Sequence, residues 1–331
     1  MNNILITGGT GSFGRALVRT LLTKPETWQR IVIFSRDELK QYDMQQEFPH
    51  ERYPQLRFFI GDVRDAERLR RAVEGIDVVV HAAALKQVPA AEYNPFEAVK
   101  TNVIGAENVI NAALDQGVSR VVALSTDKAA NPINLYGATK LCSDKMFIAA
   151  NSYAGGKQTR MSVVRYGNVV GSRGSVIPFF LKCRKSGVIP ITDPRMTRFW
   201  ITLQEGVNFV LSCLEQMKGG EIHVPKLRSM NVMDLAKALA PECRTEIVGI
   251  RPGEKIHETL ISVDDARQTL DAPDRYIVQP AFPWWDSMAY ASSNGYQSCP
   301  DGFAYTSDKN DRWFSITELQ DMVGSLHGDA S

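Results

Sequence analysis

The sequence lacks a charge excess of either sign. Its 38 Lys and Arg residues nearly balance its 37 Asp and Glu residues, which leaves a formal net charge of +1 over 331 residues. No overall field therefore favours nucleic acid or an anionic membrane, and we expect neither as a partner. An anionic ligand has to be met by a local group of side chains and backbone N–H groups.

The sequence also lacks any pairing pattern among its five cysteines. No two of them form a Cys-x-x-Cys pair and their number is odd, which argues against a disulfide framework and against a zinc site. We expect no metal. No window approaches the apolar length that crosses a bilayer, and the N-terminus shows no secretion signal. We therefore expect a cytoplasmic protein with free thiols.

The first half of the sequence alternates short apolar runs with helical patterns, as βαβ units around a parallel sheet do. The runs Val78–Val80 and Val121–Leu124 do not alternate with polar residues, which fits strands buried on both faces. The sequence therefore predicts an α/β fold, a Rossmann-like doubly wound parallel sheet with a smaller C-terminal substrate-binding lobe. We place the boundary between domains 1–170 and 171–331, with the two lobes interleaved.

The predicted strands span residues 3–7, 31–35, 56–61, 77–82, 120–125 and 162–166. The predicted helices span residues 13–23, 66–73, 95–116, 136–152, 203–216 and 232–239. Residues 284–311 are rich in Ser, Asn, Gly, Asp and aromatics, which indicates an ordered but irregular segment.

A glycine pattern follows the first predicted strand. Residues 7–14 read Thr-Gly-Gly-Thr-Gly-Ser-Phe-Gly, which places glycines where the backbone turns tightly and approaches a pyrophosphate. The N–H groups of the following helix then receive the anion. A tight turn without a ligand is the alternative, but the strand before it and the helix after it favour a dinucleotide site. The residues assigned to this site are Gly8, Thr10, Gly11, Ser12, Phe13 and Gly14.

The end of the second predicted strand distinguishes between the two nicotinamide cofactors. A carboxylate there binds the ribose 2′-OH of NAD, whereas an Arg accommodates the extra phosphate of NADP. The sequence has Ser35 and Arg36 at this point, with Lys40 one helical turn further on. These residues favour NADP. The alternative is that Arg36 is a solvated charge paired with Asp37 or Glu38.

Two further segments complete the predicted cofactor site. Asp62 and Val63 follow the third predicted strand, where a carboxylate can bind the adenine amino group; the alternative is a helix N-cap at Asp62 or Asp65. Small side chains follow the fourth strand, where a nicotinamide needs close approach to the backbone: Ala82, Ala83 and Ala84. His81, at the end of that strand, is interpreted as a core histidine.

Tyr136 and Lys140 are four residues apart and lie on one face of a predicted helix. A nearby ammonium and a nicotinamide cation lower the pKa of the tyrosine, whose phenolate can then take a proton from a sugar hydroxyl. An amphipathic helix without such a role is the alternative. Thr126 ends the preceding strand, at the edge where open α/β sheets bind ligands. Asp127 and Lys128 follow it, either as part of the site or as a surface ion pair of little energy.

Four motifs carry a resemblance to a known family. They are residues 7–14, Ser-Thr-Asp-Lys-Ala-Ala-Asn-Pro at 125–132, Tyr-Gly-Ala-Thr-Lys at 136–140 and Arg-Pro-Gly-Glu-Lys-Ile-His-Glu at 251–258. The sequence resembles the extended short-chain dehydrogenases/reductases over roughly residues 1–280. Within them it is most similar to inverting UDP-N-acetylglucosamine 4,6-dehydratases, which begin pseudaminic acid biosynthesis for flagellin glycosylation.

This resemblance implies a reaction. UDP-N-acetylglucosamine is oxidised at C4, loses water across C5 and C6, and receives the hydride back at C6. The product is UDP-2-acetamido-2,6-dideoxy-L-arabino-hexos-4-ulose. NADP as the cofactor and a homo-oligomer are implied as well.

The resemblance also implies the catalytic residues. Lys128 would be the C5 base and Asp127 the acid at O6, while Thr126 holds the C4 hydroxyl and Tyr136 removes its proton, assisted by Lys140. A base has to be neutral when it acts, so the pKa of Lys128 would have to be low. We expect burial and the charge of Lys140 to lower it, against the pull of Asp127.

A substrate site is implied in the second half of the chain. Arg251 matches the family's diphosphate ligand and Glu254 its ribose ligand, and a plain turn centred on Pro252 and Gly253 is compatible with both roles. The other residues assigned to the substrate are Lys86, Asn168, Arg173, Thr192 and Arg198.

Two other functions stay open at this point. A UDP-sugar 4-epimerase or reductase uses the same Thr126, Tyr136 and Lys140, and the pair Asp127–Lys128 argues against it because epimerases usually lack that pair. An NADP-binding regulator without turnover is the other, and the intact Tyr136 and Lys140 oppose it. Inversion rather than retention at C5 rests on the resemblance alone.

Overall fold

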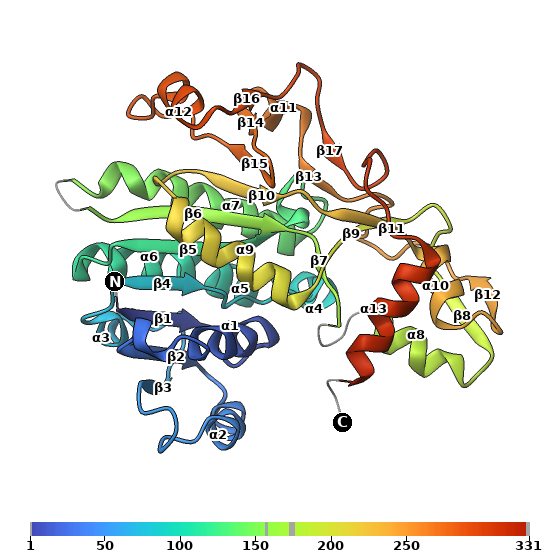
Figure 1. The fold of residues 1–331 in the computed structure, drawn as a ribbon, viewed down its shortest axis with the longest axis horizontal. Helices are drawn as coiled ribbons and strands as arrows, with labels where there is room; N and C mark the ends of the chain where they lie inside the picture. Colours follow the sequence, from blue (N-terminus) through green and yellow to red (C-terminus); the bar gives the residue numbers. More distant parts are fainter. Residues whose placement is uncertain (1, 156–157, 172–175, 329–331) are drawn as a thin grey trace.

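The computed structural model describes residues 2–155, 158–171 and 176–328. A ten-stranded sheet forms the centre of the described chain (Figure 1). Across the sheet the strands are β16 (Gln297–Ser298), β14 (Thr269–Asp271), β15 (Arg275–Val278), β10 (Ile222–Pro225), β6 (Arg160–Tyr166), β5 (Arg120–Thr126), β4 (Val78–His81), β1 (Asn3–Thr7), β2 (Arg30–Ser35) and β3 (Leu56–Ile60).

The strand order confirms the predicted fold class. Neighbouring strands from β3 to β10 are parallel, and the order reverses between β1 and β4, as in a doubly wound sheet. The six predicted strands are all present in this part. The remaining strands β15, β14 and β16 add an antiparallel edge. The chain after residue 170 thus extends the sheet that the first half begins.

Helices cover both faces of the sheet. On one face α3 (Ala66–Val73), α6 (Gly105–Gln116) and α7 (Leu135–Ala150) pack side by side, and on the other α1 (Ser12–Leu22) packs against α9 (Leu203–Gln216). Local signals fix their ends: a capping box of Thr202 and Glu205 starts α9, and Gly117, with φ 69°, ends α6.

The predicted continuous helix over 95–116 is wrong in detail. It consists of α5 (Pro95–Val99), a π-helical turn η2 (Lys100–Ile104) and α6. Asn102 lies in the wide turn and its side chain bonds both the N–H and the C=O of Leu85, at 2.8 and 2.9 Å. It also donates to Thr139 Oγ1 at 3.0 Å. The π turn therefore aims a buried amide at the loop after β4, a recurrent use of such turns.

Several short elements were not predicted. The additional helices are α2 (Glu38–Glu47), α4 (Val88–Tyr93), α8 (Val176–Arg184), α11 (Val263–Ala266), α12 (Ser287–Asn294) and α13 (Ile316–Gly328), and the 3₁₀ turns are η1 (Pro25–Thr27), η3 (Asp127–Ala129) and η4 (Asn151–Tyr153). Residues 284–311, predicted as irregular, contain α12, β16 and β17 (Tyr305–Thr306). The predicted helix 232–239 is α10 (Val232–Leu239).

Small sheets accompany the second half of the chain. They pair β11 (Arg228–Asn231) with β9 (Thr197–Ile201) and β7 (Asn168–Val169), β12 (Arg244–Ile247) with β8 (Val188–Ile191), and β13 (Thr259–Ile261) with β17.

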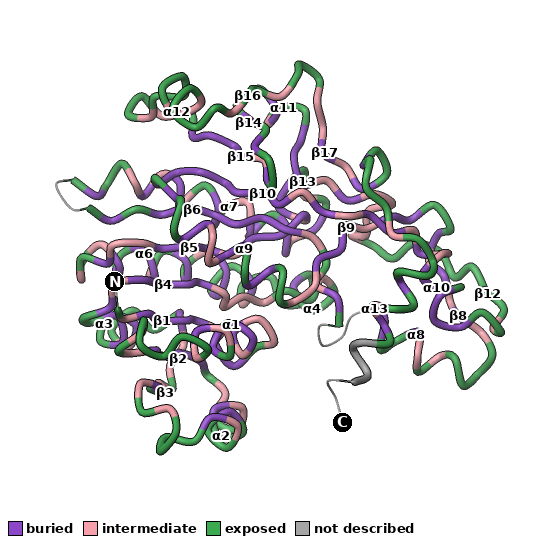
Figure 2. The backbone as a smooth tube through the Cα atoms, viewed as in Figure 1, coloured by how far each residue is buried: buried purple, intermediate pink, exposed green. Residues whose placement is uncertain are grey.

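The described chain has two large apolar cores and two small apolar clusters. The larger one follows the buried strands of the sheet (Figure 2), and it also includes Phe199, Val207 and Leu260 from beyond residue 170. The smaller one gathers Ile189, Leu235 and other residues of α8, β8, α10 and α13, which lie to one side of the sheet in Figure 1. Residues after 170 thus contribute to both cores, and a domain boundary there stays a prediction.

Candidate active site

The glycine turn between β1 and α1 lies directly against the loop that follows β4. Gly8 has φ +66°, and a Cβ there would lie 2.9 Å from the backbone of Ala83. A Cβ on Gly14 would lie 2.3 Å from the carbonyl oxygen of Gly9. Thr7 Oγ1 accepts the backbone N–H groups of Ala82 and Ala83, each at 3.2 Å. Backbone N–H groups at the start of α1 are therefore left for an anionic ligand at the point where the strand order reverses.

Charged side chains surround the end of β2. Arg36 is half exposed and forms an ion pair with Asp62 at 3.5 Å, whereas Lys40 pairs with Asp37 at 2.5 Å. Asp37 caps α2 through the backbone N–H of Lys40. The alternative partner predicted for Arg36 was Asp37 or Glu38, so its observed partner differs. Exposed ion pairs of this kind are weak, which leaves both cations able to turn to a phosphate.

The two aspartates after β3 have separate roles in the chain. Asp65 caps α3 by accepting the backbone N–H of Arg68, which confirms one of the two N-cap alternatives. Asp62 instead accepts hydrogen bonds from Arg64, at 2.9 Å from Nε and 2.7 Å from Nη2. Binding of adenine by Asp62 and by the buried Val63 stays a prediction.

His81 is a buried histidine, as predicted. Its Nδ1 is 2.8 Å from Thr7 Oγ1, while Nε2 has no hydrogen-bond partner among the described residues. Burial lowers its pKa to about 3, and the charge of Lys140 acts in the same direction. The imidazole is therefore neutral and links the ends of β1 and β4.

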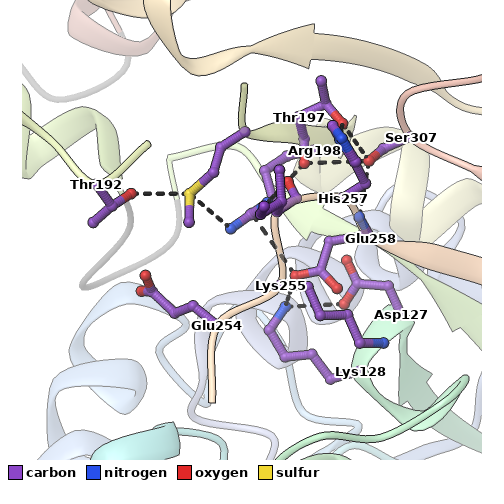
Figure 3. A network of polar contacts seen from close by, with 12 residues as sticks. Asp127, Lys128, Thr192, Thr197, Arg198, Glu254, Lys255, His257, Glu258 and Ser307 are labelled. Atoms are coloured by element: carbon purple, nitrogen blue, oxygen red, sulfur yellow. Dashed lines mark hydrogen bonds and ion pairs between the residues drawn. The ribbon is translucent and has the colours of Figure 1, made fainter. Parts of the chain in front are cut away.

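The structure brings the predicted catalytic residues to the carboxyl end of β5. Thr126 ends the strand, and Asp127 and Lys128 form the first turn of η3. Thr126 Oγ1 donates to Asp127 Oδ1 at 2.9 Å, and Lys128 Nζ donates to the same oxygen at 3.0 Å. Asp127 is almost fully buried and Lys128 is 24% exposed. The pair is therefore no surface ion pair, and Figure 3 shows both side chains within a wider polar network.

Helix α7 is held tightly against η3. Asn134 caps the helix by accepting the N–H of Gly137 at 2.8 Å. A Cβ on Gly137 would lie only 2.1 Å from the carbonyl oxygen of Lys128, so this contact requires a glycine. Tyr136, the residue before it, is thereby fixed beside Thr126, which hydrogen-bonds its hydroxyl.

The pKa shifts of the two central residues differ from those expected. Burial raises the pKa of Tyr136 to about 12, although the charge of Lys128 and the hydrogen bond with Thr126 oppose this. Burial acts to lower the pKa of Lys128, but the carboxylates of Asp127 and Glu258 outweigh it and raise the pKa. The expected low pKa of Lys128 is wrong because a second carboxylate, Glu258, faces its ammonium.

Lys140 lies deeper in the same helix. Burial lowers its pKa and the carboxylate of Asp144 opposes the shift. Asp144 accepts Ser125 Oγ at 2.7 Å and a guanidinium N–H of Arg165 at 3.4 Å. Arg165, itself buried, also donates to the carbonyl oxygen of Leu260. Sequence reasoning did not identify Asp144 or Arg165, although Asp144 lies one further helical turn along the face of Tyr136 and Lys140.

The motif at 251–258 forms a turn that docks on η3 and α7. Glu254 N–H bonds the carbonyl of Arg251 at 3.1 Å, and Gly253 adopts φ +78°. Asn134 Nδ2 donates to the carbonyl of Gly253 at 2.8 Å, and Lys255 Nζ donates to that of Ala130 at 2.6 Å. The predicted turn is confirmed, and it places this distant segment beside the predicted catalytic residues.

The residues assigned to the substrate fall into two groups. Arg198 and Thr192 belong to the network of Figure 3: Arg198 Nε is 3.7 Å from Glu258, and Thr192 bonds Met196 Sδ. Arg251 is mostly exposed and 3.7 Å from Glu254. The remaining residues are exposed or outside the described part of the chain, as Lys86 and Asn168 are exposed and Arg173 lies outside the described residues.

Within the described ranges, no group of three His, Cys, Asp or Glu residues is placed to hold a metal ion. In the same part of the chain, no helix has the length and apolar character to span a membrane. All five cysteines are free thiols.

The doubly wound sheet, its glycine turn and the Thr-Tyr-Lys group at the sheet edge define a nucleotide-binding protein of the short-chain dehydrogenase/reductase type. Residues 4–280 match the family described as polysaccharide biosynthesis protein. The chain belongs to this family.

Similar proteins include curated relatives of nearly full length. A UDP-N-acetylglucosamine 4,6-dehydratase (inverting) from Campylobacter jejuni is 54% identical, covering 98% of each chain. The predicted family resemblance is thus confirmed. A protein named UDP-glucose 4-epimerase from Rickettsia canadensis is 44% identical, over 83% of this chain and 82% of its own length.

Solved structures share the fold. The X-ray structure of Pen from Bacillus thuringiensis has a TM-score of 0.87 and 36% identity, covering 98% of each chain. A dTDP-glucose 4,6-dehydratase from Streptomyces venezuelae, DesIV, crystallised with NAD and TYD, has a TM-score of 0.70 at 21% identity, covering 99% of this chain and 97% of its own.

Proposed function

We propose that this protein is a UDP-N-acetylglucosamine 4,6-dehydratase that inverts C5 and uses NADP. The observation that carries the proposal is the buried hydrogen bond between Asp127 and Lys128, beside Thr126 and Tyr136. Elimination of water needs a base and an acid close together, and this pair supplies both. The 54% identity to the inverting Campylobacter jejuni enzyme supports the substrate and the stereochemistry.

The ion pair of Asp127 and Lys128 can convert to the form that elimination needs. If the proton moves along the 3.0 Å hydrogen bond, Lys128 becomes a neutral amine and Asp127 a neutral carboxylic acid, without net uptake of a proton. Lys128 then takes the C5 proton, and Asp127 gives its proton to O6 as water leaves. The pair returns to its charged form. A high pKa of Lys128 therefore does not conflict with its role, because the proton is exchanged within the pair.

Thr126 and Tyr136 suit the oxidation at C4. The Thr126 hydroxyl can hold the C4 hydroxyl while Tyr136 accepts its proton. Tyr136 must lose its own proton first, so its high pKa requires a further positive charge. Lys140 supplies one from the next turn of α7. When bound, the nicotinamide dinucleotide supplies storage for the hydride that leaves C4 and returns to C6.

The glycine turn suits a dinucleotide, because it packs this closely on the backbone of Ala83 and Gly9 only without a Cβ on Gly8 and Gly14. The N–H groups at the start of α1 would bind its pyrophosphate. Arg36 and Lys40 would bind the 2′-phosphate, which favours NADP over the NAD found in DesIV. The substrate diphosphate would be bound by Arg251, with Glu254 at the uridine ribose.

We also propose that the product enters pseudaminic acid biosynthesis for flagellin glycosylation, that the enzyme works in the cytoplasm, and that it forms a homo-oligomer. The resemblance of the sequence motifs to the inverting dehydratases implies these properties, and the 54% identity to the Campylobacter jejuni enzyme supports membership of that group.

A UDP-sugar 4-epimerase is the second candidate. The names of the Rickettsia relatives favour it, and Thr126, Tyr136 and Lys140 would serve both reactions. An epimerase returns the hydride to C4 and needs no acid at O6, so it gives no role to the buried Asp127.

One experiment separates the candidates. The purified protein is incubated with UDP-N-acetylglucosamine in deuterated water and the products are read by NMR. The proposal expects a 4-keto-6-deoxy sugar with one deuterium at C5, none at C6, and inverted C5. An epimerised sugar without deuterium would establish the alternative, while retained C5 would correct the stereochemistry alone. Lys128→Ala should abolish the dehydrated product, and Glu246→Gln, on the exposed strand β12, serves as the control.

A further inference from the structure

Glu258 is a buried carboxylate that faces the catalytic lysine. It is 2% exposed, and its Oε1 lies 3.3 Å from Lys128 Nζ. The same oxygen is 3.7 Å from Arg198 Nε. Its second oxygen, Oε2, has no hydrogen-bond partner among the described residues. Figure 3 shows Glu258 and Asp127 converging on the end of the Lys128 side chain.

The backbone of Glu258 is fixed from a segment far along the chain. Its N–H donates to Ser307 Oγ at 2.9 Å, and its carbonyl accepts the N–H of Ser307 at the same distance. Ser307 Oγ is in turn 2.7 Å from Thr197 Oγ1, which is 2.8 Å from His257 Nδ1. The carboxylate therefore has a defined position, set by β9, β17 and the turn at 251–258.

A carboxylate in this position has a large desolvation cost unless cations compensate it. Lys128 is nearer to it than Arg198 is, and Lys128 already has a carboxylate partner in Asp127. In a surface ion pair, one carboxylate is enough to balance the charge of a lysine. Two buried carboxylates at one ammonium instead favour the charged form of the lysine over its neutral form.

We propose that Glu258 is a positioning residue for Lys128, which holds the ammonium that the lysine becomes when it takes the C5 proton. The inference rests on the proposed function. In the elimination the C5–H electron pair forms the C5–C6 double bond, the C6–O6 bond breaks, and O6 leaves as water with the proton of Asp127. The C5 proton stays on Lys128. Glu258 stabilises the Lys128 ammonium both before its proton moves to Asp127 and after the C5 proton arrives, so its contribution to the elimination is to hold the Lys128 nitrogen in a fixed position.

Besides Glu258, four titratable groups face Lys128. They are Asp127 on its own turn, Tyr136 on α7, Arg198 on β9 and Lys255 before β13. Among these five groups, Asp127 and Glu258 are the carboxylates, and they lie 3.0 and 3.3 Å from Nζ. Glu258→Gln removes one negative charge with almost no change of volume.

The first measurement is turnover of UDP-N-acetylglucosamine and its C5-deuterated form by Glu258→Gln. We expect kcat to fall about tenfold or more, because the Lys128 nitrogen is no longer held in a fixed position for C5, and the isotope effect on kcat to rise because C5 proton transfer becomes slower than the other steps. Glu258→Asp should recover part of the rate. A variant that merely folds poorly would lose rate with an unchanged isotope effect, which would overturn the inference.

The second measurement does not need turnover. Pulse acetylation followed by mass spectrometry compares Lys128 with the exposed Lys185, since only neutral amines react. Glu258→Gln should raise the relative labelling of Lys128 severalfold, whereas Glu246→Gln should leave it unchanged. Equal labelling in wild type and Glu258→Gln would refute the inference. A wild-type protein that labels as expected but does not dehydrate UDP-N-acetylglucosamine would refute the proposed function, and with it the catalytic role of Glu258.

Discussion

At the residue scale, the site depends on a few charges buried at the carboxyl edge of the sheet. Asp127, Asp144 and Glu258 are carboxylates with almost no exposed surface, and each faces a lysine or arginine. Burial makes each of these charges costly unless its partner is present. Substitutions of these charged residues should therefore change catalytic turnover and the free energy of unfolding, and the two quantities can be measured separately.

A substitution of Arg36 tests the proposed preference for NADP over NAD. Arg36→Ala should weaken binding of NADP about tenfold or more, because a charge-assisted hydrogen bond contributes about 1.5–3 kcal/mol. Binding of NAD should change little, since it lacks the 2′-phosphate. Isothermal titration calorimetry with both dinucleotides measures the difference, and Arg52→Ala, at an exposed position in the α2–β3 connection, is the control. An equal loss for both dinucleotides would show that Arg36 does not contact the phosphate.

A substitution of Asp144 tests whether this carboxylate is the counter-ion of the buried Lys140 and Arg165. Asp144→Asn removes the anion that lies between Lys140 and Arg165 and leaves two cations buried. We expect the free energy of unfolding to fall by about 3–5 kcal/mol, as when a buried pair loses one partner. Urea denaturation measures this change. Asp264→Asn, in which an 88% exposed side chain is altered, should change stability by less than about 0.5 kcal/mol. Similar stabilities for the two variants would contradict the assignment.

At the scale of elements, the contact between α7 and η3 sets the distance between Tyr136 and the Asp127–Lys128 pair. Its closest point is Gly137, where an added Cβ would meet the Lys128 carbonyl oxygen at 2.1 Å. Neither element can move alone, because the Asn134 side chain ties the start of α7 to the turn at 251–258. The geometry of the site is therefore a property of packed backbone.

Gly137→Ala should separate these elements. We expect kcat for dehydration to fall about a hundredfold, since small displacements of catalytic groups have effects of this size. Affinity for the dinucleotide should stay near that of the wild type, because the glycine turn of β1 and α1 is not touched. Ala138→Gly, one residue further on, is a control for helix propensity without added volume. A normal kcat of Gly137→Ala would mean that catalysis does not depend on the close contact between α7 and η3.

The sequence predicted elements whose signal is local and missed those that depend on the rest of the molecule. Strands β1, β2, β4, β5 and β6 are apolar runs buried on both faces, and the edge strand β3 keeps a short apolar run despite its exposed Arg57, so each was predicted. Helix α2 was missed because only Gln41 and Met44 of its residues are buried, which leaves no apolar stripe. The π turn at Lys100–Ile104 has no known local signal; its position is explained by the bonds of Asn102 to Leu85.

The same distinction holds for the site. Thr126, Asp127, Lys128 and Tyr136 were predicted together because a strand end and a helix start place them at one edge. Glu258 lies in a motif that was recognised, but nothing local indicates that its carboxylate reaches Lys128. The direction of the Lys128 pKa shift was wrong for that reason.

At the scale of the whole molecule, two buried histidines predict how stability depends on pH. Burial lowers the pKa of His81 to about 3 and that of His223 to about 4. Unfolded chains bind protons at these positions below about pH 6.5. Stability is therefore fully present above that pH and falls as the pH drops toward about 4, by up to about 1.4 kcal/mol per pH unit for each histidine.

Urea denaturation at a series of pH values from 7.5 to roughly 4.5 measures this slope. His223→Gln should reduce the dependence of the free energy of unfolding on pH by the contribution of one histidine. His50→Gln, at an exposed position, should not change it. A slope that is the same in the wild type and in His223→Gln would mean that His223 does not contribute to the acid sensitivity.

We expect an apolar surface beside α7 to join two copies of the chain. Tyr93 at the end of α4 is 88% exposed and Phe96 in α5 is 78% exposed, and both helices pack against α7. Apolar side chains exposed together mark contact sites, and a second copy of this chain is the partner we expect. Phe96→Glu places a charge in that contact and should reduce the molar mass measured by light scattering to that of one chain, 36.8 kDa. Met288→Glu changes an 82% exposed side chain on α12 and should leave the mass unaltered. If the wild type already has the mass of one chain, or if Phe96→Glu keeps the larger mass, the surface does not join two copies.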